Sequence, residues 1–181
     1  VGLAPSISGS PTVNHFALAT DADTTLSSDL TANGNLILNN DFSNNANIIT
    51  LSGDIAQYIV GSGNFNAYNL TIDNDAGVDA SSATSLKVDN LLLVNSGVFT
   101  SKSDYSSVSI FSDGTLALSG PITVSGNWAN SGTFTHNNHG VTLDGASQTL
   151  SGTTTFYDLT KTVASAATLT FPAGATTTIT N

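Results

Sequence analysis

The chain of 181 residues has no cysteine and no methionine, and neither glutamate nor arginine occurs anywhere in it. Without cysteine there can be no disulfide and no thiolate metal site. Glutamate and arginine are strong helix formers. The residues that take their place are Thr, Ser, Asn, Gly and Asp, which favour strands, turns and caps. The sequence therefore predicts an all-β protein.

Charge is also scarce, since only 9% of the residues are charged against about 25% in ordinary soluble domains. All 13 acidic residues are aspartates, the three bases are Lys87, Lys102 and Lys161, and the formal net charge is −10. Such a chain has no basic patch for the phosphates of nucleic acids and no attraction to anionic lipid. No apolar run reaches the ~18 residues of a membrane span. We therefore expect no nucleic-acid partner and no insertion into membranes.

What the chain does contain is internal repetition, which is the signature of repeat architectures. The order of the matched segments is kept while their separation increases by a few residues, as in a duplication whose turns accept insertions. We take 31–109 and 110–181 as the two copies within one continuous elongated domain, and 1–30 as an N-terminal cap or strand-exchange segment. The matched pairs are 35–45 with 121–131, Phe42 with Trp128, 49–53 with 141–145, Gln57 with Gln148, and 67–72 with 156–161.

A shorter period lies inside the longer one. The segment NSGVFT (95–100) recurs as NSGTFT (130–135), and two coils of about 17 to 18 residues would account for this separation. Short alternating strands are separated by turn residues throughout. The run 91–94 (LLLV) is apolar at every position, which predicts a strand covered on both sides.

Two architectures fit these patterns. The first, which we favour, is a parallel β-solenoid (β-helix) built from the internal repeats, because the strands are short, the sub-period is short and charge is rare. The alternative is two tandem β-sandwich domains of about 90 residues, because the long repeat has the length of an immunoglobulin-like domain and Asn-Gly and Asp-Gly turns suit hairpins.

The second copy also carries a resemblance. It reads GNWANSGTFT (126–135), VTLDG (141–145), Gln148 and FYDLT (156–160). This order is similar to the β-strand repeat units of large bacterial and archaeal cell-surface proteins, and the similarity extends over about 33–181. The resemblance implies an extracellular or cell-surface location, an extended β-rich stalk or filament, and no catalytic residues.

Three aspartates form the main candidate metal site. Asp73, Asp75 and Asp79 occur in the string DNDAGVD, in which alternate oxygen ligands and a central glycine suit Ca²⁺. The string has no bidentate glutamate after it, and the corresponding stretch of the second copy, 162–165, has no acid. A solvated turn explains the same residues. We expect no required cofactor, and calcium is the one that the sequence leaves open.

The evidence for catalysis is weaker. His136 and His139 could hold a divalent metal, but no further ligands are evident and we prefer a surface turn. The chain has no Gly-x-Ser-x-Gly elbow and no cysteine nucleophile. We therefore expect that the protein is not an enzyme. The aromatic residues at matched positions, Phe42 with Trp128 and Tyr68 with Tyr157, predict core stacking before a carbohydrate-binding face.

The function that we expect is mechanical: the chain is a structural extracellular protein, a subunit of a self-assembling surface filament or the stalk of an adhesin. The last strand, 176–181, has no charge or proline to protect its edge, so we expect end-to-end self-association there. The first alternative is a carbohydrate- or surface-binding module with surface glycans as partners. The second is a β-helical polysaccharide-degrading enzyme.

Overall fold

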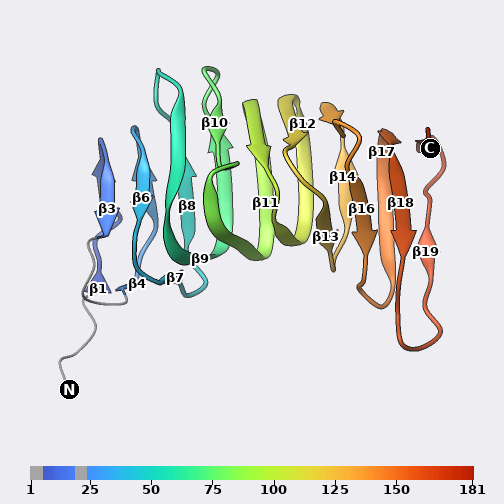
Figure 1. Ribbon diagram of the computed structural model, residues 1–181, viewed down its shortest axis with the longest axis horizontal. Coiled ribbons are helices and arrows are strands. Elements are labelled where there is room, and N and C mark those ends of the chain that lie inside the picture. The colour runs from blue at the N-terminus through green and yellow to red at the C-terminus, as the bar shows by residue number, and fades with distance from the viewer. Residues whose placement is uncertain (1–5, 19–23) are drawn as a thin grey trace.

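The computed structural model describes residues 6–18 and 24–181, which form a parallel β-solenoid of about eight coils with no helix in these residues (Figure 1). The all-β solenoid predicted from the sequence is confirmed. The alternative of two β-sandwiches is wrong, because every strand pair among the described residues is parallel. A sandwich would need antiparallel hairpins.

The described residues form strands that are mostly two to four residues long, with four longer ones. In chain order they are β1 (Ser6–Ile7), β2 (Thr12–Val13), β3 (Phe16–Leu18), β4 (Thr24–Leu26), β5 (Leu30–Ala32), β6 (Leu36–Leu38), β7 (Phe42–Asn44), β8 (Ile48–Leu51), β9 (Gln57–Asp73), β10 (Val78–Asp79), β11 (Ala83–Ser101), β12 (Asp104–Leu118), β13 (Ile122–Val124), β14 (Trp128–Asn130), β15 (Thr133–Thr135), β16 (Gly140–Leu143), β17 (Gln148–Phe156), β18 (Asp158–Lys161), β19 (Leu169–Thr170) and β20 (Thr176–Ile179).

Each coil contributes a strand to each of three faces, and equivalent strands of successive coils pair side by side. Face A contains β1, β4, β7, β13, β16 and β18. Face B contains β2, β5, β8, β14 and β19, and face C contains β3, β6, β10, β15 and β20. The long strands β9, β11, β12 and β17 run around the corners and belong to more than one face. For example, β9 pairs in turn with β6, β7 and β8.

The alternation of side chains along each strand explains the core. In β5, β6, β7, β13 and β14 the first and third residues are buried and the middle one is half-buried on the outside. Successive side chains of a strand point to opposite faces, so Leu, Ile, Val and Phe at alternate positions line the inside. The inward residues of all coils join into one hydrophobic core. The core is therefore continuous along the whole solenoid.

The length of a coil varies more than the sequence indicates. Phe65 pairs with Phe42, whereas Val108 pairs with Leu92, so a coil takes from 16 to 23 residues. The extra residues lie at corners, where a longer loop changes nothing in the stacking of the strands on either side. This tolerance is why the repeat drifts in sequence.

The duplicated segments have similar local structure but lie on different faces. Phe42 belongs to face A, whereas its match Trp128 belongs to face B. Likewise, Gln57 begins the face-C part of β9, and Gln148 begins the face-B part of β17. Strand β15 has no counterpart between β7 and β8 and accounts for the growth in separation. Both aromatic side chains are buried, as predicted.

Two further expectations concern particular segments. The run 91–94 is covered on one side only: Leu92 and Val94 are fully buried, but Leu91 and Leu93 face outward and are half-buried. A solenoid has no second layer outside its faces, so that prediction was wrong. In the N-terminal segment 1–30, the described residues pair with the next coil as β1 to β5. Residues 1–5 and 19–23 of that segment lie outside the described residues, and strand exchange stays a prediction.

Candidate functional sites on the solenoid

The structure separates Asp79 from the other two candidate calcium ligands. Asp73, the last residue of β9, and Asp75, in the loop after it, line a hollow of about 510 Å³ together with Asp54. Asp79, the last residue of β10, lines a different hollow. There its carboxylate accepts a hydrogen bond from the backbone N–H of Ser81 at 2.8 Å, as aspartates do in tight turns.

The Asp73 carboxylate already has protein partners. Its Oδ1 accepts hydrogen bonds from Asn95 Nδ2 at 2.8 Å and from Ser96 Oγ at 3.3 Å in the next coil. Within residues 6–18 and 24–181, no three His, Cys, Asp or Glu side chains form a group that could hold a metal ion. Calcium binding at Asp73, Asp75 and Asp79 stays a prediction.

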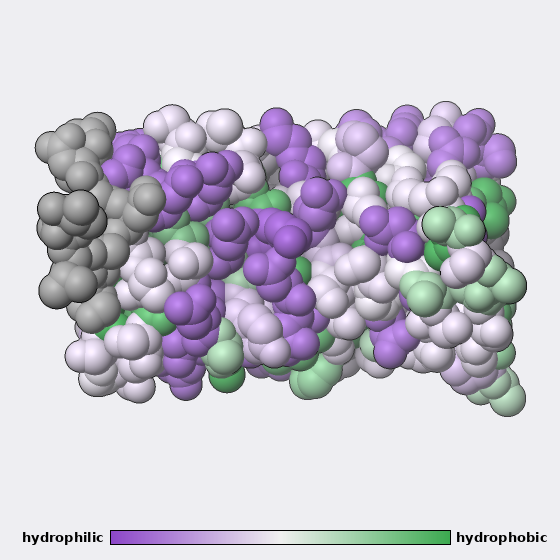
Figure 2. All heavy atoms as spheres, turned by 90° about the horizontal axis from the view of Figure 1, so that it is seen from below, coloured by the Kyte–Doolittle hydropathy of each residue, from purple (hydrophilic) through white to green (hydrophobic). Residues whose placement is uncertain are grey.

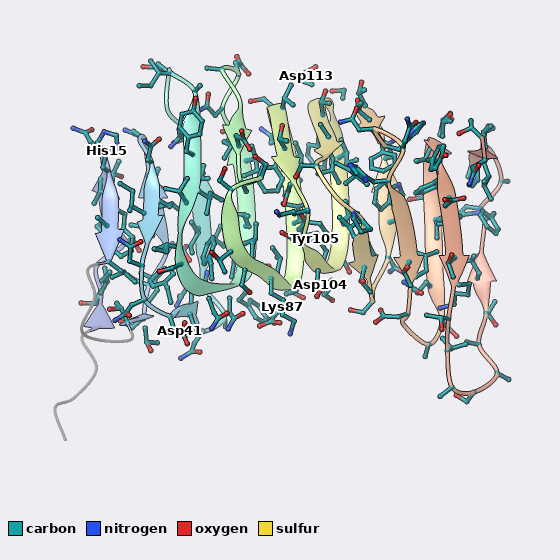
Figure 3. All side chains as sticks on the ribbon, in the orientation of Figure 1. His15, Asp41, Lys87, Asp104, Tyr105 and Asp113 are labelled. Carbon is teal, nitrogen blue, oxygen red and sulfur yellow. The ribbon has the colours of Figure 1, made fainter. Side chains whose placement is uncertain are left out.

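A second hollow, of about 340 Å³, lies on face A and contains side chains of both charges. It is lined by Lys87, Asp89, Asp104 and Asp144, and Figure 3 shows Lys87 and Asp104 at the same edge of the ribbon. Lys87 Nζ lies 2.6 Å from Asp89 Oδ1. This hydrogen bond and the charge of Asp89 raise the pKa of Lys87, with a smaller contribution from Asp104. Both partners are exposed, so the pair adds little stability.

These carboxylates do not have the environment of a glycosidase site. Such a site keeps one carboxyl group protonated by burying it in apolar surroundings. Asp89, Asp104 and Asp144 are all exposed. The hollow therefore offers carboxylates and one paired ammonium group, but no carboxyl group shielded as a general acid requires.

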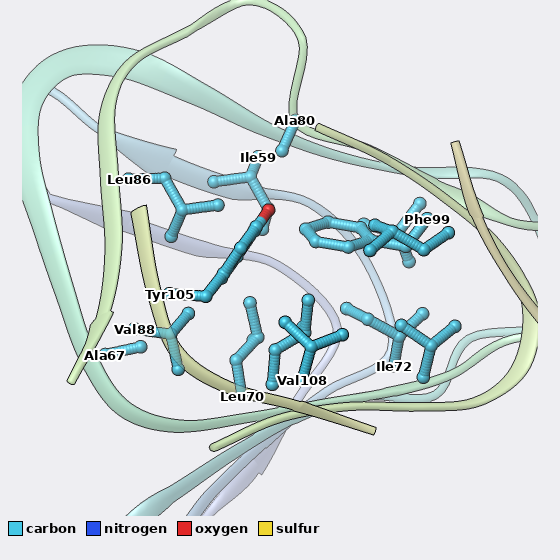
Figure 4. Close-up of a cluster of buried hydrophobic side chains, with 14 of the residues drawn as sticks. Ile59, Ala67, Leu70, Ile72, Ala80, Leu86, Val88, Phe99, Tyr105 and Val108 are labelled. Atoms are coloured by element: carbon cyan, nitrogen blue, oxygen red, sulfur yellow. The ribbon is translucent and has the colours of Figure 1, made fainter. Parts of the chain in front are cut away.

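Directly inside this hollow lies a buried tyrosine. The Tyr105 ring packs among inward aliphatic side chains (Figure 4). Its hydroxyl donates to Ser101 Oγ at 2.7 Å, and Ser101 and Ser103 share a hydrogen bond of 3.0 Å. Burial raises the pKa of Tyr105 to about 12, despite the opposing effect of the two serines. The phenol of Tyr105 is therefore shielded from solvent, and its role is to pack in the core.

The two neighbouring histidines form a turn. His136 Nδ1 accepts a hydrogen bond from the backbone N–H of Asn138 at 3.0 Å, and His139 N donates to His136 O at 2.8 Å. Asn137 and Asn138 have the positive φ angles of 48° and 61° that asparagine tolerates in turns. The ring of His136 lies 5.7 Å from that of Tyr157. This geometry matches the surface turn that we preferred.

Exposed aromatic residues do not line up on one face. Tyr58 lies on face C, Tyr68 lies at the corner between faces A and B, and Phe111 lies at the corner between faces B and C. A fourth, Phe171, directly follows β19 in the last coil, and the four are 38% to 49% exposed. Aromatic rings that bind a sugar chain follow one another along a face, and these four do not.

The matched glutamines mark a polar site that the sequence did not explain. Gln57 is buried, and its Nε2 donates to the carbonyl oxygens of Ala32 and Gly34 in the preceding coil, at 2.9 and 2.6 Å. Its Oε1 accepts from Gly53 N at 3.1 Å and from Asn74 Nδ2, in the following coil, at 2.7 Å. The amide thus joins three coils at a corner where the strand ladder is interrupted.

The second copy repeats this arrangement with one change. Gln148 Nε2 donates to the carbonyl oxygens of Val124 and Gly126, at 2.9 and 2.5 Å. Its Oε1 accepts from Lys161 Nζ at 2.5 Å, and the same ammonium group donates to Gly145 O. A lysine therefore takes the place that the neutral Asn74 has in the first copy.

Lys161 is on the inside of the last coil. It pairs in register with the fully buried Leu143, and its side chain is half-buried. The aspartate of the same strand, Asp158, lies on the outer side, where it accepts a hydrogen bond from Asn181. Both hydrogen-bond acceptors of Lys161 are neutral. The buried polar side chains of the described residues are all uncharged: Thr24, Asn44, Gln57, Asn74, Ser101, Ser103, Asn130, Gln148 and Thr154.

The last coil leaves part of the core open. Strands β18, β19 and β20 pair on one edge with β16 and β17, and no strand of the described residues pairs with their far edges. The inward residues Leu159 and Leu169 are half-buried, and Ile179 is 51% exposed. Figure 2 shows hydrophobic atoms gathered at this C-terminal end.

Comparisons of the chain with protein-family models, with curated proteins and with solved structures found no match. Among the described residues there is no helix long and apolar enough to cross a membrane.

Proposed function

We propose that the chain is a structural part of an extracellular surface protein, either a length of an adhesin stalk or a subunit of a filament. The observation that carries this proposal is the parallel strand ladder, which runs through every described coil and ends in open edges. Open strand edges lined by apolar residues pair with further strands unless they are protected. Neighbouring β-coils therefore continue the solenoid.

At the N-terminal end, no strand of the described residues pairs with the far edges of β1, β2 and β3. The inward residues Ile7, Val13, Phe16 and Leu18 of the first described coil are half-buried, whereas their partners in the next coil, such as Leu26 and Leu36, are fully buried. Terminal repeats of a solenoid that stands alone in water need a polar outer face. The described inward residues of the two terminal coils are instead mostly apolar, with Lys161 as the exception, which supports continuation of the solenoid.

The outer surface suits a passive spacer. On face B, threonines follow one another in register on four successive coils at Thr12, Thr31, Thr50 and Thr71. Threonine has a high strand propensity, and its hydroxyl keeps the surface wetted without charge. The resemblance of the sequence to β-strand repeats of surface proteins supports the same function.

The alternatives have less support. A module for surface glycans would use a row of exposed aromatic residues, but Tyr58, Tyr68 and Phe111 lie apart. A polysaccharide-degrading enzyme would use a shielded carboxyl group, but Asp104 and Asp144 are exposed. Release of sugar products by the purified protein, abolished by Asp104→Asn, would overturn the structural function.

Pulling single molecules by their two ends tests the structural function directly. A load-bearing solenoid resists extension and then yields in cooperative steps, because each coil is held by its neighbours. One coil releases about 55 to 80 Å of chain, because its 16 to 23 residues become fully extended. Smooth extension at low force, without steps in multiples of this length, would contradict a mechanical function.

A further inference from the structure

We infer that the coil which covers the C-terminal end brings a carboxylate to Lys161, so that this end accepts an acidic β-coil and rejects a second copy of this chain. The inference depends on the proposed function, because it assumes that another coil continues the solenoid. It decides between the two forms of that function, since a chain that rejects its own copies belongs to a stalk and not to a filament of one subunit.

The first observation is the position of Lys161 in its inward column. Eight residues precede Lys161 in this column of face A, and each of the eight is uncharged. Lys161 is the only charged residue of the column, and it belongs to the coil with the open edge. The eight residues, from the N-terminal end, are Ile7, Leu26, Asn44, Ala67, Val88, Tyr105, Val124 and Leu143.

The second observation is what the equivalent site looks like once it is covered. Asn74 donates to Gln57 just as Lys161 donates to Gln148, but further coils stack over Asn74 and leave it 1% exposed. The covered site uses a neutral amide, whose Nδ2 also donates to Ile55 O at 2.9 Å. Lys161 would bring a full positive charge to the same kind of interior corner.

The cost of covering Lys161 follows from its partners. Its ammonium group has two neutral acceptors, Gly145 O and Gln148 Oε1, and water reaches the half-buried side chain from the open end. A covering coil removes that water, and a buried charge without a counter-charge is strongly unfavourable. Natural sheets use an inward-pointing charge at an edge to prevent unwanted strand pairing. A carboxylate in the covering coil removes the penalty.

The described residues of the chain's own N-terminal coil, 6–18, place no carboxylate in this column. If a second copy continued the ladder in register, its Ile7 would lie over Lys161, because both residues belong to the same column. The other inward residues of the described first coil are Val13, Phe16 and Leu18, which are apolar. The register therefore assigns the acid of the covering coil to the position of Ile7.

This assignment can be tested with the full chain and its variants. Ile7→Asp supplies the missing carboxylate, Ile7→Asn is the neutral control of the same shape, and Ile7→Asp with Lys161→Asn removes the pair. Circular dichroism first confirms that each variant keeps its β structure. Sedimentation velocity over a concentration series and electron microscopy then detect end-to-end assembly.

We expect the natural chain and Ile7→Asn to stay monomeric at the concentrations at which Ile7→Asp assembles. Ile7→Asp should assemble at a concentration at least about ten-fold lower than Ile7→Asn, in line with the coupling of close charge pairs, and Lys161→Asn should reverse this gain. Assembly of the natural chain as readily as Ile7→Asp would overturn the inference, and so would an Ile7→Asp protein that stays monomeric. Neither result changes what the pulling experiment is expected to show, because that experiment tests the mechanical function separately.

Discussion

The single tryptophan of the chain is the centre of a small aromatic cluster. The ring of Trp128 lies 4.9 Å from that of Phe134 and 5.3 Å from that of Phe156, and Phe134 and Phe156 are 5.4 Å apart. Its indole Nε1 donates to the buried Thr154 Oγ1 at 3.0 Å. Aromatic pairs at these distances stabilise a core beyond the area that they bury. The cluster therefore anchors the C-terminal coils.

Trp128→Ala should lower the free energy of unfolding by about 3 to 5 kcal/mol, because it leaves a cavity beside two rings and removes the hydrogen bond from the indole to Thr154. Urea denaturation measures the change. Phe111→Ala, at a site that is 48% exposed, is the control and should change stability by no more than about 0.5 kcal/mol. Equal effects of the two substitutions would contradict the packing described for Trp128.

Tyr105 predicts how stability depends on pH. Burial raises its pKa from 10.0 in the unfolded chain to about 12 in the folded protein. Below pH 10 the phenol is protonated in both states and adds no pH dependence. Between pH 10 and about 12 only the unfolded state loses the proton, so stability falls as pH rises through this window. Tyr105→Phe should remove this fall, whereas Tyr58→Phe, at an exposed site, should leave it in place in denaturation curves at successive pH values.

At the scale of single residues, the sequence predicted burial better than function. Phe42 and Trp128 were identified as core residues from their matched positions, since repetition of an aromatic residue reports packing. The inward direction of Lys161 could not be seen, because a charged residue in an alternating strand is normally assigned to the outer side. Asp73 and Asp79 were grouped by sequence proximity, although a corner and a strand between them direct the two carboxylates into different hollows.

At the scale of strands and corners, glycine is required where the backbones of successive coils approach closely. Gly97 lies at a corner of β11 with φ of 69°, and a Cβ there would lie 1.8 Å from Asn74 O in the preceding coil. Gly152 is similar, with φ of 80° and Asn130 O at 1.8 Å. These corners need glycine both for the left-handed backbone and for the space.

Gly97→Ala and Gly174→Ala separate these two requirements. Gly174 has φ of 84° but nothing within 4 Å of a Cβ, so Gly174→Ala should cost only the about 1 to 2 kcal/mol of the left-handed conformation. Gly97→Ala should cost clearly more, because the backbone of two coils must also move apart. Thermal denaturation of the two variants measures the difference. If both variants lost the same stability, the close approach at Gly97 would be wrong.

The sequence predicted strands well and corners poorly. Strands such as 36–38 and 122–124 were identified because apolar and polar residues alternate where a strand has an inner and an outer side. The long strands β9, β11 and β12 were not foreseen, since their backbone pairing continues around corners where the alternation is lost. For the same reason sequence matching could not show that the two copies lie on different faces, because a linear alignment contains no information on rotation about the axis.

At the scale of the whole molecule, stability is built from neighbouring coils. Each coil contacts the one before and the one after it, as the strand pairings show, and the core continues through all of them. In such a quasi-one-dimensional protein the stability is a sum over coils and their interfaces. A whole coil is therefore a unit that can be added or removed, whereas part of a coil is not.

Excising residues 104–122 tests this property. Thr123 and Val124 pair with Asp104 and Tyr105. The excision therefore moves each later strand into the place of the equivalent strand in the preceding coil.

The junction then brings together apolar residues that already point into the core. Val88 meets Val124 in place of Tyr105, and Leu92 meets Trp128 in place of Val108. We expect a folded protein with cooperative unfolding that is about 4.8 Å shorter, the spacing of one coil. Excising only 104–112 removes the strands of faces A and B but leaves that of face C, and this control should not fold. Circular dichroism and small-angle X-ray scattering distinguish the two results, and equal loss of structure in both proteins would show that the coils are not independent units.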